Sequence, residues 1–170
     1  TWLSLRLAAA TDYSVGAAPT AAADQEAALR RIALPMSKYF VCKRTPIVVG
    51  EAMECLGGGG YVEESGLPRL YREAPLNSIW EGSGNVNALD LLRAITRSPE
   101  SLDAWLQEVG SVSGSDANFD SAVTDVLNTL AGDPSTMQAQ GRRLAERMAL
   151  LLQGSILIRH APTPVSDAFI

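Results

Sequence analysis

The stretch Asn77–Ile95, NSIWEGSGNVNALDLLRAI, holds the side chain with the clearest chemical potential. Glu81 lies between Trp80 and the small turn Gly82–Gly84, directly before an apolar helical pattern. The small neighbours leave space around the carboxylate and offer backbone and hydroxyl donors. Because a helix N-terminus stabilises anions, this position suits a carboxylate base or a bound phosphate. The alternative is that Glu81 faces solvent and only favours the start of the helix.

The four glycines Gly57–Gly60 form a second candidate site. Without a Cβ atom, glycines let backbone N–H groups approach a phosphate closely. No strand pattern precedes this run and no Gly-Lys-Ser/Thr follows it, which excludes the Rossmann and P-loop signatures. The competing interpretation is that Gly57 is the residue just beyond a helix C-terminus, where glycine is common.

A metal centre is not indicated, although the sequence has four nearby glutamates: Glu51, Glu54, Glu63 and Glu64. A carboxylate-bridged metal pair in a helical bundle uses Glu-x-x-His motifs. The one histidine, His160, falls near the end of the last predicted helix, where it suits the helix C-terminus. Cys42 and Cys55 form no Cys-x-x-Cys motif, so we expect two buried thiols in a reducing cytoplasm, not zinc ligands or a redox pair.

Composition favours one globular cytoplasmic domain. The chain has 170 residues and is 46% hydrophobic, which suffices for one sizeable core. Its formal net charge of -5 and pI near 4.9 mean that the chain as a whole does not attract nucleic-acid phosphates. The most apolar window, Met148–Ile158, has 11 residues and is too short for a bilayer core of about 30 Å. The N-terminal apolar run lacks the basic region of a signal peptide.

Helical periodicity dominates the chain, and a strand pattern occurs only briefly at Ile47–Val49. We therefore predict an all-α helical bundle. One long helix is expected over Asp24–Leu56, with kinks or a break at Pro35 and Pro46. An ordered loop with one or two helical turns near Arg69 should follow. The remaining expected segments are a helix over Asn85–Thr96, a Ser98-capped helix from Pro99, a flexible connection over Gly110–Asn118, helices over Phe119–Gly132 and Asp133–His160, and a helix that begins at VSDAF.

The stretch Glu51–Asn85, EAMECLGGGGYVEESGLPRLYREAPLNSIWEGSGN, resembles the flavin-dependent acyl-CoA dehydrogenases. Their pattern is a helix, Gly-Gly-x-Gly-Tyr/Phe, Arg-Asp and then Ile-Tyr-Glu-Gly-Thr, and several of these motifs occur here in the same order. A weaker likeness to the AidB-type branch, which is linked to the adaptive response to DNA alkylation, runs from Asp24 to Phe169. The resemblance implies that residues 1–170 are the C-terminal four-helix-type domain, without the N-terminal helical domain and β-barrel of a longer chain that we expect to be cut at both ends.

The same resemblance implies roles for individual residues. Glu81 matches the base that removes the α-proton of an acyl-CoA thioester while a β-hydride passes to flavin N5. Its backbone N–H would help to hold the thioester carbonyl. Trp80, which stands in place of the usual Tyr, and Gly82 would line the substrate pocket. The remaining positions match FAD contacts: Glu54, Gly57, Gly58, Ser83 and Asn85. Within this set Glu54 replaces a Gln and Ser83 replaces a Thr.

An FAD site shared with a neighbouring subunit implies a homo-oligomer, a dimer or tetramer. We expect no membrane partner, because the most apolar window is too short to span a bilayer. The implied function is an FAD-dependent acyl-CoA dehydrogenase, which we expect to be inactive as this isolated segment. A segment without its neighbouring domains should also self-associate or rearrange its helices, because apolar surface normally covered by those domains becomes buried in another way. The chain could alternatively serve only as a helical oligomerisation domain.

The AidB-type branch is also associated with double-stranded DNA, which gives a different functional class. A DNA-associated flavoprotein of alkylation defence, with weak or vestigial dehydrogenase activity, is therefore the alternative. The candidate phosphate contacts are Arg142, Arg143 and Arg147, together with Lys38, Lys43 and Arg44. Against this, Arg142 and Glu146 are spaced as an i, i+4 pair, and the acidic pI is typical of a solvated helix face.

Overall fold

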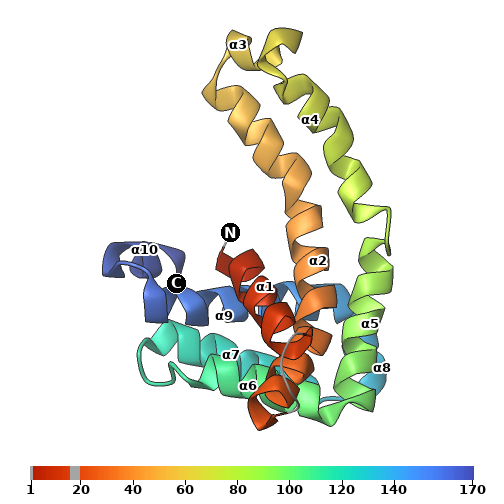
Figure 1. The fold of residues 1–170 in the computed structure, drawn as a ribbon, viewed down its shortest axis with the longest axis vertical. Coiled ribbons are helices and arrows are strands. Elements are labelled where there is room, and N and C mark those ends of the chain that lie inside the picture. The colour runs from red at the N-terminus through yellow and green to blue at the C-terminus, as the bar shows by residue number, and fades with distance from the viewer. Residues whose placement is uncertain (1, 16–19) are drawn as a thin grey trace.

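The computed structural model describes residues 2–15 and 20–170, and within these ranges every regular element is helical (Figure 1). The all-α prediction is therefore confirmed for this part of the chain. The helices form two parts: a packed body and an arm that projects from it (Figure 1). None of the helices in the described ranges combines the length and the apolar character that crossing a membrane requires.

The long helix α2, Ala21–Cys55, belongs to both parts. Its first turn is capped by Thr20, whose Oγ1 accepts a hydrogen bond from the N–H of Ala23 at 3.1 Å. The helix continues through Pro35 and Pro46, so the expected break is absent. A proline removes one backbone donor and costs about 3 kcal/mol inside a helix. Packing of the first half of α2 against the other helices of the body offsets this cost at Pro35.

The body contains the hydrophobic core. Helix α1, Trp2–Val15, lies against the first half of α2, and α5, Gly84–Arg97, α6, Pro99–Gly110, and α9, Gly141–His160, complete the packing. The largest fully buried side chains lie on these helices and on α7: Ile32, Met36, Leu91, Trp105, Val109, Val126, Leu144, Met148 and Leu152. Most of these residues fall at the helical spacing that predicts their helices, whereas Leu91 and Leu152 lie beside the expected apolar positions Leu92 and Leu151.

The arm pairs the second half of α2 with a returning chain of short helices (Figure 1). These are α3, Gly58–Tyr61, the 3₁₀ turn η1, Glu63–Ser65, α4, Leu67–Glu73, and the 3₁₀ turn η2, Ala74–Ser78. The return is thus more helical than the expected loop. Within the described residues, the main core cluster takes no member from 41–90. The arm therefore holds its shape largely apart from the core.

The thiol prediction is wrong for one cysteine and only partly met by the other. Cys55 is exposed and Cys42 is half-buried, and both are free. The reason is architectural, because the second half of α2 leaves the body and most of its surface faces solvent. Helical periodicity alone did not show where α2 stops contributing to the core.

The C-terminal third differs from prediction at the last long helix. The expected helix from Asp133 to His160 is two helices, α8, Pro134–Ala139, and α9, which separate at Gln140. Helix α9 begins on Gly141, where a Cβ would lie 3.2 Å from Leu92 Cδ1. The separation therefore brings backbone close to α5. The sequence pattern missed it because apolar residues continue at helical spacing across the junction.

The connection after α6 is a hydrogen-bonded turn and not a flexible linker. Val112 in this turn is buried, and the N–H of Gly114 donates to Asp120 Oδ2 at 3.0 Å. Asp116 then caps α7, Ala117–Leu130, through its Oδ1. The last helix is α10, Thr163–Phe169, in agreement with the expected helix start.

Candidate functional site

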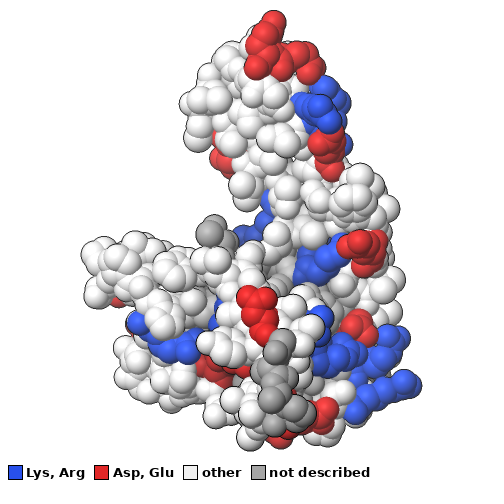
Figure 2. All heavy atoms as spheres, viewed as in Figure 1, with Lys and Arg blue, Asp and Glu red and all other residues white. Residues whose placement is uncertain are grey.

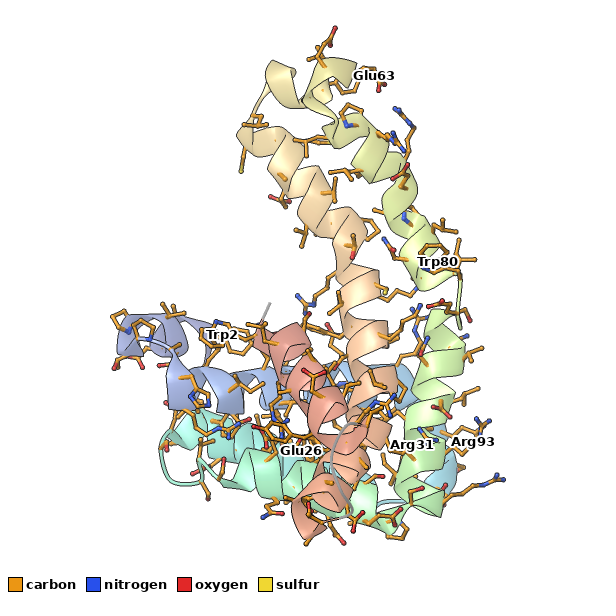
Figure 3. The ribbon with its side chains drawn as sticks, in the orientation of Figure 1. Trp2, Glu26, Arg31, Glu63, Trp80 and Arg93 are labelled. Atoms are coloured by element: carbon orange, nitrogen blue, oxygen red, sulfur yellow. The ribbon has the colours of Figure 1, made fainter. Side chains whose placement is uncertain are left out.

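Glu81 lies in the short loop that joins η2 to α5, where the arm meets the body. Trp80, beside it, is on the outer side of this junction (Figure 3). Among the described residues other than glycine, Glu81 alone has a positive φ, +50°. Gly82 follows with φ +102°. The left-handed conformation costs a non-glycine residue about 1–2 kcal/mol, so Glu81 holds a strained backbone at an exposed position.

Hydrogen bonds from two side chains hold the loop. Lys38 Nζ, from α2, donates to the carbonyl oxygens of Asn77 at 2.9 Å and Trp80 at 2.8 Å, and lies 3.5 Å from that of Gly82. Asn87 Nδ2, from α5, donates to the carbonyl oxygen of Gly82 at 2.7 Å. The loop carbonyls are therefore drawn toward α2 and α5. Sequence reasoning did not connect Lys38 or Asn87 with the site.

The N-terminus of α5 borders the same loop. Ser83 is its N-cap residue, but the Ser83 side chain makes no capping hydrogen bond. Gly84 is buried, and a Cβ there would lie 2.6 Å from Lys43 Cε. Only glycine fits without movement of the lysine. Asn85 is exposed in the first helical turn, beside a groove between α5 and the start of α9.

The second cluster lies at the tip of the arm, at the end of α2. Gly57 follows the C-cap residue Leu56 with φ +55°, so its predicted helix-ending position is confirmed. A Cβ placed on Gly57, Gly58 or Gly59 would meet no atom within 4 Å. Gly60 differs, because its Cβ would lie 2.2 Å from the Met53 carbonyl oxygen. Close packing against Met53 therefore explains why residue 60 is glycine, but it does not explain the glycines at 57, 58 and 59.

A groove adjoins this tip and includes Glu54, Gly57 and two tyrosines, Tyr61 and Tyr71. A carboxylate near a pyrophosphate needs a cation beside it, and Lys43 is a basic residue on the same helix as Glu54. It lies over Gly84 instead, about 16 Å along α2 at 1.5 Å per residue. Glu54 makes no ion pair with the other described residues and is exposed.

The structure therefore divides the predicted site into two groups. Residues Trp80–Ser83 and Asn85 lie together at the junction of arm and body, whereas Glu54, Gly57 and Gly58 lie at the arm tip. Figure 3 shows this separation through Trp80 and Glu63, a neighbour of the tip. One copy of the chain does not bring both groups to the same point.

Three arginines considered for DNA, Arg142, Arg143 and Arg147, lie on α9, and two of them contact other side chains of the chain. Arg142 Nε donates to Tyr39 Oη at 3.3 Å, and its guanidinium lies 5.8 Å from the centre of the Tyr39 ring. Arg147 is 3.5 Å from Asp125. Arg143 is exposed.

Glu146 pairs with Arg44 at 2.9 Å, so the expected Arg142–Glu146 pair is wrong. The interhelical contact replaced the local one because α2 crosses α9 there. Arg44 also lies 4.4 Å from the centre of the Phe40 ring.

On the face shown in Figure 2, basic and acidic side chains are interspersed.

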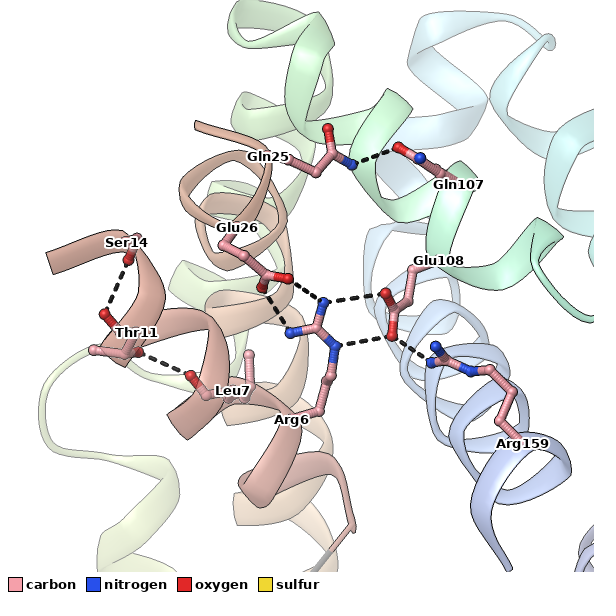
Figure 4. A network of polar contacts seen from close by, with 9 residues as sticks. All are labelled: Arg6, Leu7, Thr11, Ser14, Gln25, Glu26, Gln107, Glu108 and Arg159. Atoms are coloured by element: carbon pink, nitrogen blue, oxygen red, sulfur yellow. Dashed lines mark hydrogen bonds and ion pairs between the residues drawn. The ribbon is translucent and has the colours of Figure 1, made fainter. Parts of the chain in front are cut away.

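A network of charged side chains joins α1 to α2 and α6 (Figure 4). Arg6 contacts Glu26 at 2.7 Å and Glu108 at 2.8 Å, and Arg159 contacts Glu108 from the other side. Burial opposes ionisation of Glu108, but hydrogen bonds and charges from Arg6 and Arg159 outweigh it and lower its pKa. Sequence reasoning missed this network because its members are 20 to 102 positions apart.

The match that decides the family covers α1 to α5 and includes the Glu81 loop. A family model described as acyl-CoA dehydrogenase, C-terminal domain, matches residues 3–96. The chain belongs to the acyl-CoA dehydrogenase family. Its all-α architecture agrees with that family's C-terminal helical domain.

Individual relatives place the chain more closely. The putative acyl-CoA dehydrogenase AidB of Escherichia coli K12 is 40% identical over 169 residues, which is 99% of this chain and 29% of AidB. Acyl-CoA dehydrogenase family member 11 of Caenorhabditis elegans is 33% identical over 156 residues, 81% of this chain and 25% of that protein. The chain thus resembles the AidB-type branch along its whole length, and it spans less than a third of these acyl-CoA dehydrogenase relatives.

Solved structures agree with this assignment. The crystal structure of C. elegans ACDH-11 in complex with C11-CoA matches with a TM-score of 0.80 and 29% identity, covering 98% of this chain and 30% of that one. The apo form of Bd2924 matches with a TM-score of 0.76 and 26% identity, covering 92% and 29%. The acyl-CoA dehydrogenase fold therefore extends over the body and the arm.

Proposed function

We propose that this chain contributes the general base, Glu81, and parts of the FAD and thioester sites to an FAD-dependent acyl-CoA dehydrogenase. One observation carries the proposal: an exposed carboxylate has a strained, left-handed backbone in a loop that is held by hydrogen bonds. Strain of this kind persists only where the surroundings enforce it, and it concentrates at functional sites. A glutamate that only faced solvent would not need it.

The chemistry follows from the residues of this loop. The Glu81 carboxylate removes a proton from the α-carbon of the acyl thioester and becomes the neutral acid. The backbone N–H of Glu81 donates a hydrogen bond to the thioester carbonyl, where negative charge develops. FAD, when bound, accepts the hydride from the β-carbon. The product is the α,β-unsaturated thioester.

The substrate class is supported by the site and by the relatives. Trp80 is 54% exposed beside Glu81, so its indole offers an apolar wall for an acyl chain. Gly82 lets the backbone approach the ligand on the other side. AidB is named a putative acyl-CoA dehydrogenase, and ACDH-11 was solved with C11-CoA. We extend that ligand class to this chain.

The residues also fit FAD at both ends of the arm. The Ser83 hydroxyl makes no cap contact and is exposed at the N-terminus of α5, where a polar ligand atom is favoured. Gly57 and Gly58 have no side chain and open space around them, which lets a phosphate approach the backbone. Glu54 next to a pyrophosphate requires a cation from outside the described residues of this copy.

These two groups suit two different FAD molecules. Because one copy keeps them at opposite ends of the arm, each FAD would touch the junction of one subunit and the arm tip of another. A homo-oligomer is therefore part of the proposal.

The test is the flavin absorbance of the protein purified in its native length, recorded anaerobically before and after addition of a panel of acyl-CoAs. The wild type should bleach, and Glu81→Gln should retain bound flavin that does not bleach. Glu100→Gln is the matched control, because Glu100 is exposed in the first turn of α6 on the body. It should behave as the wild type.

Flavin that no acyl-CoA bleaches would overturn the dehydrogenase proposal and favour the DNA-associated alternative. Retention on duplex DNA would then test that alternative, because phosphate contacts weaken steeply with added salt. Absence of flavin would leave the chain as a helical scaffold.

A further inference from the structure

We propose that Lys38 is a positioning residue for the reaction: it fixes the loop carbonyls so that the backbone N–H of Glu81 faces the substrate. The inference rests on the proposed function and adds a residue to it. Lys38 lies on α2, far from the loop in sequence, and contacts neither thioester nor flavin in this role. It acts through the peptide groups that flank Glu81.

The contacts of Lys38 are unusual for a lysine on a helix surface. Among the described residues its hydrogen-bonding partners are backbone carbonyls of one short segment, those of Asn77, Trp80 and, at the outer limit, Gly82. An ammonium group has three donors and no acceptor. The three carbonyl groups therefore match its donors and concentrate negative dipole ends on one side of the loop.

The planar peptide group links the contact of Lys38 with the Trp80 carbonyl to the direction of the Glu81 backbone N–H. All peptide bonds in the described residues are trans, so each C=O points opposite to the N–H of the following residue. The Trp80 carbonyl points toward Lys38, and the N–H of Glu81 must point away from it. By the same argument the N–H of Ser83 points away, because the Gly82 carbonyl is held by Asn87 and Lys38.

The two outward N–H groups remain available. Neither the N–H of Glu81 nor that of Ser83 donates to a backbone oxygen elsewhere in the described chain. Because the Trp80 carbonyl faces Lys38 on α2, the N–H of Glu81 points to the side of the loop away from α2. This arrangement offers donors to an oxygen that gains negative charge, which is what stabilisation of a thioester enolate requires.

Lys38 is well placed to keep this arrangement rigid. Its neighbours Ser37 and Tyr39 are buried in the body, so the backbone that carries Lys38 is fixed. The side chain then reaches from the body to a strained loop at the base of the arm. These contacts direct the donors of Lys38, which the sequence suggested as a phosphate contact for DNA, at carbonyl oxygens of the loop.

The experiment measures exchange of the substrate α-proton into D₂O by NMR, with C11-CoA and the flavin-loaded protein of native length. Oxygen and electron acceptors are absent, so net oxidation stops after one turnover while proton exchange continues. Displacement of a catalytic group by a distant change costs about 100-fold in rate, and loss of one oxyanion donor about 100- to 1,000-fold. We expect Lys38→Met to lower the exchange rate at saturating C11-CoA by about 10- to 100-fold, with a smaller change in the concentration that gives half the maximal rate.

Lys38→Arg retains donors and should restore part of the rate. Arg69→Met is the charge control, because Arg69 belongs to the arm and contacts Glu73 alone among the described carboxylates. It should exchange at the wild-type rate. If Lys38→Met does not fold, the comparison moves to Lys38→Arg and Lys38→Gln, where a graded loss supports the proposal.

Wild-type exchange in Lys38→Met, with no exchange in Glu81→Gln, would overturn the role of Lys38 and leave the proposed function intact. Wild-type exchange in Glu81→Gln would instead overturn the function itself. Equal rates in Lys38→Arg and Lys38→Gln would also overturn the positioning role. If no Lys38 variant folds, Lys38 serves stability and the proposal fails.

Discussion

At the scale of the residue, Glu81 shows a conflict between stability and chemistry. Its positive φ would be relaxed by glycine, which has no Cβ to clash with the backbone. A glycine would also remove the only carboxylate in the loop. Retention of glutamate at a site that favours glycine is therefore consistent with a chemical role.

We predict that Glu81→Gly raises the free energy of unfolding by about 0.5–1 kcal/mol, because relief of left-handed strain exceeds the added freedom of the unfolded chain. Flavin bleaching by acyl-CoA should be lost. Chemical denaturation followed by circular dichroism measures the first effect. Glu100→Gly is the control with the opposite sign, since glycine inside the first turn of α6 should destabilise. A destabilised Glu81→Gly would show that the backbone at this position is not strained.

Glu108 gives a prediction about pH. Its pKa is lowered in the folded protein, despite burial, by Arg6 and Arg159. The folded state therefore binds fewer protons than the unfolded state between the two pKa values. The stability from Glu108 is fully present above the ordinary pKa of 4.5 and is lost as the pH falls through the lower folded value. The denaturant concentration at the unfolding midpoint should therefore decrease as the pH is lowered from 5 to about 3.

Arg6→Met should remove much of that acid sensitivity and lower the free energy of unfolding at pH 7 by about 2–3 kcal/mol, because Glu108 and Glu26 lose a largely buried partner. Chemical denaturation at pH 7 and at pH 4 measures both effects. Arg69→Met should show neither effect, since its contact with Glu73 is exposed. An Arg6→Met protein as stable as the wild type would mean that the network in Figure 4 contributes nothing.

At the scale of the element, the arm depends on the close approach of α3 to α2. Gly60→Ala would place a Cβ 2.2 Å from the Met53 carbonyl oxygen, so backbone must move. We predict a loss of about 1–3 kcal/mol in the local stability of the tip. Amide hydrogen exchange of peptides over residues 50–73 measures this. Gly59→Ala is the matched control with open space and should exchange as the wild type. Equal exchange in both variants would contradict the packing role of Gly60.

Elements with local signals were predictable from sequence. Asp133 caps α8 through its side chain, and Pro99 begins α6 as expected, although the Ser98 side chain before it makes no capping hydrogen bond. Asp116, within the expected flexible connection, also caps a helix, α7. The continuity of α2 through Pro35 was not predictable in this way. Pro35 is buried in the body, and tertiary packing overrides its local penalty.

The site was predictable only in part for the same physical reason. Glu81 and Ser83 are adjacent in sequence and belong to a recognisable motif. Lys38 meets its carbonyl partners across 39 to 44 positions, and no local spacing marks such a contact. From its charge alone, Lys38 is expected to face solvent or to contact DNA phosphates. The fold instead places it against the loop. Periodic sequence patterns report local structure, so they do not identify residues that contact backbone groups far away in the sequence.

At the scale of the whole molecule, the arm leaves a large amount of apolar surface uncovered. Its exposed residues include Ile47 at 65%, Val48 at 62%, Tyr61 at 78% and Ile79 at 64%. Exposed apolar side chains of this size commonly mark a surface that contacts another protein, and the arm projects from the body, where a second copy can pack against it. The proposed sharing of FAD between subunits requires such a contact.

We therefore predict that the 170-residue chain self-associates at micromolar concentration. Size-exclusion chromatography with light scattering should give at least twice the monomer mass of 18.1 kDa. Val48→Glu introduces a charge that must be desolvated in an arm interface, and it should shift the mass toward the monomer. Val15→Glu is the control, since Val15 is 71% exposed on α1, away from the arm. A wild-type mass of 18.1 kDa would contradict association through the arm, and equal dissociation by both variants would place the contact on the body instead.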